Sequence, residues 1–550
     1  MDYYQLVKEN AGERSDLTDR MDKDVELRNL EAYVMRNAKG VAVEGIINVT
    51  LNRPKTMAAF IIASLGNTSE QILVETEDKN LDVDYIKDFR RLTFAAADAR
   101  LSGRRMWEIN SFFDEQSSIR GGAAARCLFQ MVNGVLVPDI TLWDYRYVNN
   151  GEGDDGLDWA SYGYGTKKKK AVIESEKWWA KVKNKVSVSG KEAEVVEVWD
   201  KEHFEIWLTG KKVYEQGHIY GFTPAVVLGV PLGSMIADID DIKNQNESIF
   251  FLIREAMPEL NRLVSIIQTQ ALGTLYPPVE NKRKEGATSP PPKYSEVMAP
   301  GAISSADIGG GTNIITTADA NRAAMMAMER MDRNMNEGGF IPRQLDSPAP
   351  SGVALIIEKE GKDVIYLPRL KLKAAMKQAL GDMFTAQVLK IGGEVEIGTP
   401  GHKRTFSAEK LKGQYQVTHK FSVKSLATDA GLASLSASYG TTISEHTKRR
   451  AILQLDDPDG EERWLSYEEA ERLSPLVKLR HQVKDLIEMK EYADARLLAK
   501  QAGVELKQLL AGSVSKPEVG KEPTQMVSLF GGNQGRSRQP APKVPVEEVK

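Results

Sequence analysis

The stretch Asn246–Lys390 alternates helical patterns with long irregular segments, and this layout constrains the fold more than any other feature of the chain. Apolar residues recur with a helical period over Ser248–Gly273, and the pattern stops at the Tyr276–Pro278 break. Pro258 lies inside this pattern, so we expect the helix to kink there. A connection as long as the one that follows is too long for an ordinary turn between helices.

Two further helices are expected in the same stretch. The excursion over 277–316 contains runs of Pro and Gly with short β-like pieces between them. A second helix over 317–337 is rich in Ala and Met. The Gly- and Pro-rich segment 338–352 then precedes a third, long helix, which Pro368 is expected to bend.

The flanking sequence predicts an α+β domain. Residues 1–40 have mainly helical patterns, and a strand is expected at 45–51. Strand patterns dominate 128–207 and return at 222–231, 395–397 and 415–417. We expect the late strands to complete the earlier sheet. The α+β domain is then discontinuous, and the helices of 248–352 form an insertion in it.

The C-terminal part divides in two. Residues 428–512 are predicted to be helical, and the Pro-rich tail from Ser513 is predicted to be disordered because its composition cannot bury enough apolar area. Within the tail only Met526–Phe530 could dock on a partner, and a passive tail is the default interpretation.

Bulk composition excludes several classes of protein. The 550 residues allow several domains, and the net charge of -4 provides no global basic field for nucleic acid. A single cysteine, Cys127, excludes an internal disulfide, and we expect a buried thiol. No apolar run reaches the roughly 18 residues of a membrane span, and the N-terminus does not have the pattern of a signal peptide.

Signals for an enzyme are few. Gly309–Thr312 lacks the spacing of a phosphate-binding loop, and the six histidines are isolated from one another. The acidic group Asp238, Asp240 and Asp241 could hold a cation, but complementing a helix N-terminus explains it more simply. Lys167–Lys170 fits a solvated edge better than a DNA contact. We therefore expect no enzymatic activity, no cofactor and no metal.

The order of helix, excursion, helix, Gly/Pro-rich loop and long helix resembles the stem, clip, stem and tunnel loop of the portal proteins of tailed bacteriophages. Resemblance also extends to Asn52–Thr56, to Trp143–Val148, and to Asp241–Lys243 leading into Glu247–Phe250. These patterns are spread from about position 20 to 425, and their order along the chain carries the resemblance.

The resemblance implies a division of the chain into portal domains. These are an N-terminal and wing α+β domain at 1–245, a first stem helix at 246–275, a clip at 276–316, a second stem helix at 317–337, a tunnel loop at 338–352, a long bent helix with returning wing strands at 353–427, a helical crown at 428–512 and a disordered tail at 513–550.

By the same resemblance the chain is one subunit of a ring, a homododecamer, at one capsid vertex of the virion, assembled in the host cytoplasm. The ring would conduct double-stranded DNA non-specifically during genome packaging and ejection. It would dock the terminase large subunit and a head-tail adaptor, and it would contact the major capsid or scaffolding protein. No membrane is involved.

Two sets of residues are the site candidates. The tunnel loop would approach passing DNA through Arg343, Gln344, Leu345, Asp346 and Ser347. The second stem helix would pack between subunits through Met325, Met328, Met331 and Met335, since flexible thioethers fill irregular gaps.

Two other functions compete. A different head-tail ring protein is one, although adaptors tend to be shorter than this chain. A phage-associated hydrolase or nuclease with a site built from scattered residues is the other, and the absence of every nucleotide, metal and nucleophile signature argues against it.

Overall fold

The structure is a computed structural model of the full chain. It describes residues 2–511 except 79–80, 133–134, 155, 237, 276–278, 283–310, 315–324, 332, 334–351, 400, 424–432, 435, 441, 450–452, 454–457, 489–491 and 502–504. The chain forms two compact units, Met1–Asp456 and Asp457–Lys550. Helices and strands are mixed in the first unit, which confirms the predicted α+β class.

The first unit is built on a three-stranded antiparallel sheet in the order β11-β2-β3. The strands of this sheet are β2 (Gly122–Val132), β3 (Val135–Trp143) and β11 (Ala225–Gly229). The helices that share its core are α4 (Val83–Gly103), α5 (Ile109–Ile119) and α11 (Gly352–Ile391). Successive residues of β2 face opposite sides of the sheet, as the period of a strand requires. Cys127 lies on the side that packs against α4 and α11, and burial raises the pKa of its thiol, which confirms the expected buried cysteine.

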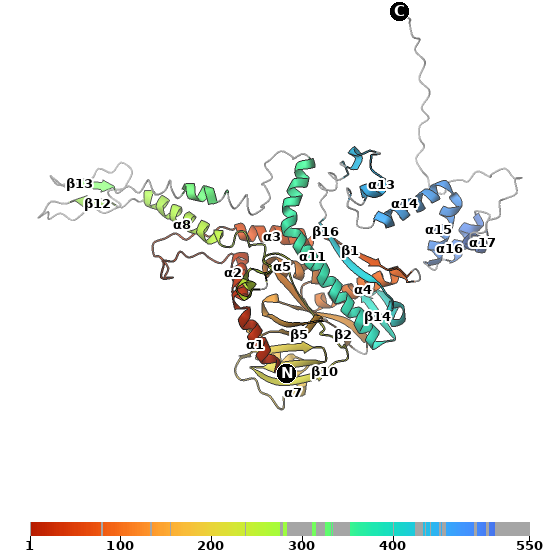
Figure 1. The fold of residues 1–550 in the computed structure, drawn as a ribbon, viewed down its shortest axis with the longest axis horizontal. Helices are drawn as coiled ribbons and strands as arrows, with labels where there is room; N and C mark the ends of the chain where they lie inside the picture. The colour runs from red at the N-terminus through yellow and green to blue at the C-terminus, as the bar shows by residue number, and fades with distance from the viewer. Residues whose placement is uncertain are drawn as a thin grey trace, which may run out of the picture. The chain divides into compact units, whose positions relative to one another are not determined.

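The chain returns to this unit after its long helix. β16 (Gln416–Val423) pairs antiparallel with β1 (Thr68–Glu75), and β14 (Glu394–Thr399) forms a hairpin with β15 (His402–Ser407). Figure 1 shows β16 beside β1, next to α11. The expectation that the late strands complete the sheet of residues 128–207 is therefore wrong, because β14, β15 and β16 pair with other strands. Alternation sets which side chains are buried, but the partner strand depends on distant residues.

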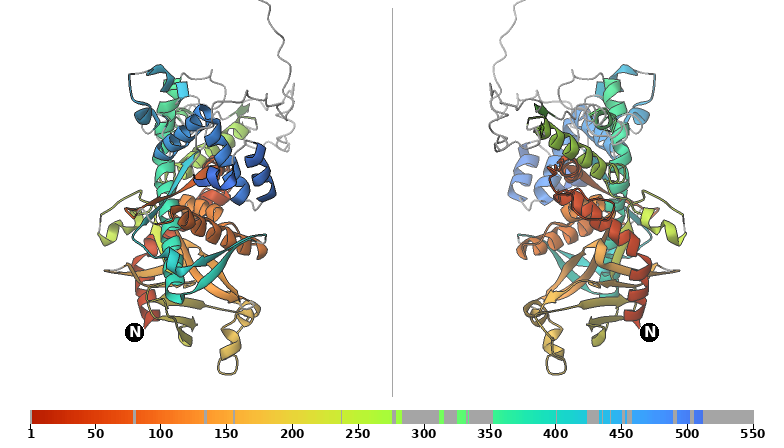
Figure 2. Two further views of the ribbon diagram at one scale, coloured as in Figure 1. Left: turned by 90° about the vertical axis from the view of Figure 1, so that its right-hand side faces the viewer. Right: turned by 90° about the vertical axis from the view of Figure 1, so that its left-hand side faces the viewer.

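A second, five-stranded sheet lies near the N-terminus, in the order β10-β9-β8-β5-β4. Its strands are β4 (Val148–Gly153), β5 (Gly156–Tyr162), β8 (Val195–Asp200), β9 (His203–Leu208) and β10 (Lys211–Gly217). α1 (Tyr3–Glu13) packs on one face through Val7, and the segment with α6 (Lys170–Ser175) and α7 (Trp179–Val182) packs on the other through Trp179. Figure 2 shows this segment standing out from the strands.

The remaining elements of the first unit include the helices that support the insertion. They are α2 (Ser15–Asn29), α3 (Arg53–Gly66), η1 (Tyr145–Tyr147), β6 (Lys168–Lys169), β7 (Glu192–Ala193), η2 (Ile239–Asn244), α8 (Ala256–Leu275), β12 (Val279–Lys282), β13 (Gly311–Ile314), η3 (Ala408–Leu411) and α13 (Glu445–Thr447).

The second unit is helical in its described part. It contains α14 (Pro458–Leu473), α15 (Pro475–Glu488), α16 (Tyr492–Gln501) and α17 (Leu506–Ala511). Its small core is built from Val483, Ala495 and Ala499. Leu473, at the end of α14, is 78% exposed. The predicted tail and its Met526–Phe530 segment lie outside the described residues.

Candidate functional site

Helix α8 starts later than its sequence pattern predicts. Residues 249–255 form consecutive turns, and the helix begins at Ala256. Pro258 then occupies the first helical turn, where a missing N–H leaves no hydrogen bond unmade. The expected mid-helix kink at Pro258 is therefore replaced by a helix start.

A polar stripe on α8 holds an extended segment of the N-terminal region. Asn261, Ser265 and Thr269 are spaced by one helical turn each. They accept hydrogen bonds from the backbone N–H groups of Leu51 (3.0 Å), Val49 (2.8 Å) and Ile47 (2.9 Å).

The prediction of a strand at 45–51 is wrong, although the backbone of this segment is extended. Alternate N–H groups of this segment bond to helix side chains, and among the described residues it pairs with no strand. The alternation in the sequence does not distinguish these two kinds of partner. This contact ties α8 to residues more than 200 positions away.

A buried ion cluster lies at the base of α8. The Arg254 guanidinium donates to both carboxylate oxygens of Asp24, at 2.7 and 3.0 Å, and to Glu247 at 2.6 Å. Asp24 has no exposed surface. Burial raises the pKa of Asp24, although the hydrogen bonds from Arg254 act in the opposite direction. Burial alone would lower the pKa of Arg254, but the hydrogen bonds to Asp24 and Glu247 outweigh burial, and the pKa of Arg254 is raised. The burial of each group therefore depends on its hydrogen bonds to the other.

Two more arginines hold the backbone just before α8. Arg20 donates to the carbonyls of Lys243 (2.6 Å), Gln245 (2.7 Å) and Asn246 (2.9 Å). Arg369 of α11 donates to the Glu247 carbonyl at 3.2 Å. Burial lowers the pKa of Arg20, and it lowers the pKa of Arg369 to about 9. Helices α2 and α11, which are distant in the sequence, thus fix the point at which the chain enters α8.

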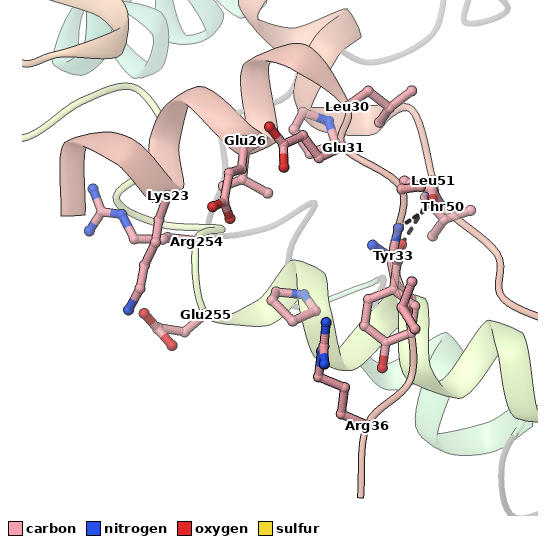
Figure 3. A pocket seen from close by; sticks show the side chains of 16 residues that line it. Lys23, Glu26, Leu30, Glu31, Tyr33, Arg36, Thr50, Leu51, Arg254 and Glu255 are labelled. Atoms are coloured by element: carbon pink, nitrogen blue, oxygen red, sulfur yellow. Dashed lines mark hydrogen bonds between the residues drawn. The ribbon is translucent and has the colours of Figure 1, made fainter. Parts of the chain in front are cut away.

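A hollow of about 410 Å³ opens beside this cluster. Figure 3 shows Lys23, Glu26, Arg36, Arg254 and Glu255 around it. Three acidic and three basic side chains line the hollow, and apolar groups from α2, the segment 30–51, α3 and α8 complete the lining. Such a mixed wall favours no single class of small ligand.

Helix α11 carries a second row of buried cations. Lys373 donates to Asp114 at 2.8 Å, and Lys377 donates to Glu70 at 3.2 Å. His419 lies 2.8 Å from the other oxygen of Glu70 through Nδ1. Each lysine is 2% exposed. These pairs attach α11 to α5 and to the β1–β16 pair.

The tunnel-loop candidates Arg343, Gln344, Leu345, Asp346 and Ser347 lie outside the described residues. The two ends of the excursion are described: β12 pairs antiparallel with β13, with Val279 opposite Ile314. The excursion therefore begins in one strand and ends in the other strand of a single two-stranded ribbon.

The candidate methionines have different surroundings. Residues 325–331 are helical. Met328 and Met331 pack, partly buried, against a core shared by α3, α8 and α11. Met325 is 48% exposed, and Met335 lies outside the described residues. Their predicted role between subunits stays a prediction.

The structure also bears on the metal and membrane signals that the sequence analysis weighed. Asp240 and Asp241 lie in the first turn of η2, and Asp241 accepts a hydrogen bond from Asn244 at 2.6 Å, as expected for residues at a helix start. No group of three or more His, Cys, Asp or Glu residues in the described ranges could hold a metal. Among the helices that the structure describes, none is long and apolar enough to cross a membrane.

The sequence did not point to the ion cluster at the base of α8. Asp24 and Arg254 are 230 positions apart, and neither belongs to a recognisable motif. Only the recurrence of cations at Arg369, Lys373 and Lys377 offered a signal, because a charge at every fourth position lies on one side of a helix.

Comparisons with known proteins give a weak structural likeness. No protein-family model matches the chain, and no curated protein matches it. Among solved structures, the chain is similar to a chain of one described as the neck of an empty GTA particle computed with C6 symmetry. The likeness covers 73% of this chain and 90% of that chain, at 12% identity and a TM-score of 0.38. At this level it assigns neither fold nor function.

Proposed function

We propose that this chain is the portal subunit of a tailed phage, a ring-forming protein at one capsid vertex through which double-stranded DNA is packaged and ejected. The observation that carries the proposal is an insertion of helix, ribbon and helix anchored in an α+β body. α8 leaves the body at the ion cluster, β12 and β13 close the excursion, and α11 returns to the core.

Exposed apolar side chains on the insertion support a ring. Leu272 of α8 is 44% exposed, and Met325 and Met326 are 48% and 64% exposed. Large apolar groups that one subunit leaves in water are typical of surfaces that a partner covers. In a closed ring each subunit presents two different faces to its neighbours, so both sides of the insertion can be covered.

The proposed roles follow the order of the elements. α8 and the helix around 325–331 are the stem, the excursion with β12 and β13 is the clip that docks terminase and adaptor, and 338–352 is the tunnel loop. The chain performs no covalent chemistry, and a separate terminase hydrolyses ATP. A ring of twelve subunits is the stoichiometry that the resemblance implies.

Removing Gln344–Ser347 tests whether the tunnel loop acts on DNA in the channel of the ring. If this loop approaches DNA in the channel, the deletion gives rings of normal size that package or retain DNA poorly. Arg343→Ala is the matched control and has only a small effect, because one exposed phosphate contact contributes little and DNA must slide past. DNA packaged per procapsid is measured beside ring yield. Unchanged packaging by the deletion variant would contradict the proposal.

A further inference from the structure

The five-stranded sheet separates two surfaces of opposite charge. Strand alternation assigns the faces: Val195, Ile206 and Leu208 pack under the α6–α7 segment, whereas Val196 and Trp207 pack under α1. Successive side chains of a strand point to opposite faces, so the two coverings lie on opposite sides of one sheet.

The segment over 167–191, here called the basic lid, covers the first face. It contains nine lysines and two glutamates, a formal charge of +7. All of these lysines except Lys168 are exposed. Within the described residues, only Lys168 and Lys170 among them form ion pairs, with Glu176 and Glu174. Most of the charge of the basic lid is therefore not neutralised by its own chain.

A hollow of about 550 Å³ on the α1 face, here called the acidic hollow, has the opposite charge. Tyr3, Trp159 and Glu205 in its lining place it on that face. Six carboxylates and two lysines line it, a formal charge of -4 with His203 neutral. Lys201 and Lys212 pair with some of the acids, but Glu152 and Glu202 at its edge are exposed.

We infer that the basic lid of one subunit docks on the acidic hollow of its neighbour in the ring, an inference that rests on the proposed function. The occupant is a second copy of this chain because both complementary surfaces belong to the same domain and lie on opposite faces of it. A closed ring repeats one heterologous contact, and such a contact needs two different surfaces that fit each other.

Charge reversal on each surface tests the contact. In the lid variant Glu replaces Lys167, Lys169, Lys177, Lys183 and Lys185, which changes the formal charge of the basic lid from +7 to -3. In the hollow variant Lys replaces Glu152, Glu202 and Glu215, which changes the formal charge of the acidic hollow from -4 to +2. Each variant alone needs at least about tenfold more protein to form rings, because like charges then face one another. Mixing the two variants restores ring formation, since every contact in an alternating ring is again complementary. Ring yield is measured by mass photometry over a concentration series.

Lys403→Glu/Lys412→Glu is the matched control, since both side chains are about half-exposed and lie outside this domain. It leaves ring yield unchanged. Circular dichroism of all variants checks the fold, and the mixing experiment remains decisive even if one variant is less stable. Rings that form normally from both reversal variants, or a mixture that does not recover, overturn the inference while the proposed function stands. If the wild-type chain never forms rings, that result contradicts the proposed function itself. If the lid variant forms normal rings but retains DNA poorly, the basic lid contacts DNA instead of the neighbouring subunit, and the inference is overturned.

Discussion

Replacing Arg254 by Met tests whether the ion cluster at the base of α8 supports the first unit. The change removes both hydrogen bonds to Asp24, whose side chain has no exposed surface, while Glu247 keeps Arg20 at 3.5 Å. Removing one partner of a buried pair costs about 3–5 kcal/mol because the other charge is left without compensation. We expect a loss of that size in the free energy of unfolding of the first unit at pH 7.

The double variant Arg254→Met/Asp24→Leu separates the lost pair from the lost packing. It leaves neither charge unpaired at this position, so it recovers most of the loss. Urea unfolding followed by tryptophan fluorescence measures both variants against the wild-type chain, with a second measurement at low pH.

The pH dependence gives a further check with a definite sign. Burial already raises the pKa of Asp24, and loss of Arg254 raises it further. A carboxyl whose pKa is higher in the folded protein costs stability as the pH rises, so the deficit of the single variant is largest at neutral pH and shrinks on acidification. A deficit below about 1 kcal/mol at pH 7, or one that does not change with pH, refutes the reasoning.

Three other outcomes are expected. Ser265→Ala should speed hydrogen exchange at the Val49 amide by about tenfold, because that N–H loses its acceptor; unchanged exchange would mean that the bond does not hold the segment. Burial alone would raise the pKa of Glu70. The hydrogen bond from His419 and the charge of Lys377 outweigh burial, so the pKa of Glu70 is lowered. Its contribution is therefore lost as the pH falls, so Glu70→Gln should lose less thermal stability than the wild type between pH 7 and about pH 3, and an equal loss would contradict this. Truncation after Gly512 should leave ring formation intact, because the tail has too little apolar area to offset ordering at about 1–2 kcal/mol per residue; loss of the soluble oligomer would show that the tail packs.

Local patterns in the sequence predicted most elements of the first unit but not their partners. The strand patterns at 195–199 and 204–207 appear as β8 and β9, and Cys127 is buried as expected. Residues 45–51 are extended, yet the polar side chains of α8 replace the expected partner strand. A periodic pattern shows which side chains share a face, whereas the group opposite that face is fixed by tertiary packing.

The ion pairs show the same limit in a stronger form. Lys373 and Lys377 would be assigned to a solvated helix face, since lysines are rarely buried without a partner. Asp114 and Glu70, which make their burial possible, are more than 250 positions away. The cost of burying these charges is offset only once the fold brings the carboxylates to them, so the recurrence of cations along α11 could not reveal their partners.

The most direct test of the portal account is the size and shape of the purified protein. Negative-stain microscopy together with native mass spectrometry, at micromolar concentration and in both low and moderate salt, should show a closed ring with a central hole, in keeping with a dodecamer. A monodisperse monomer under the same conditions would contradict the account.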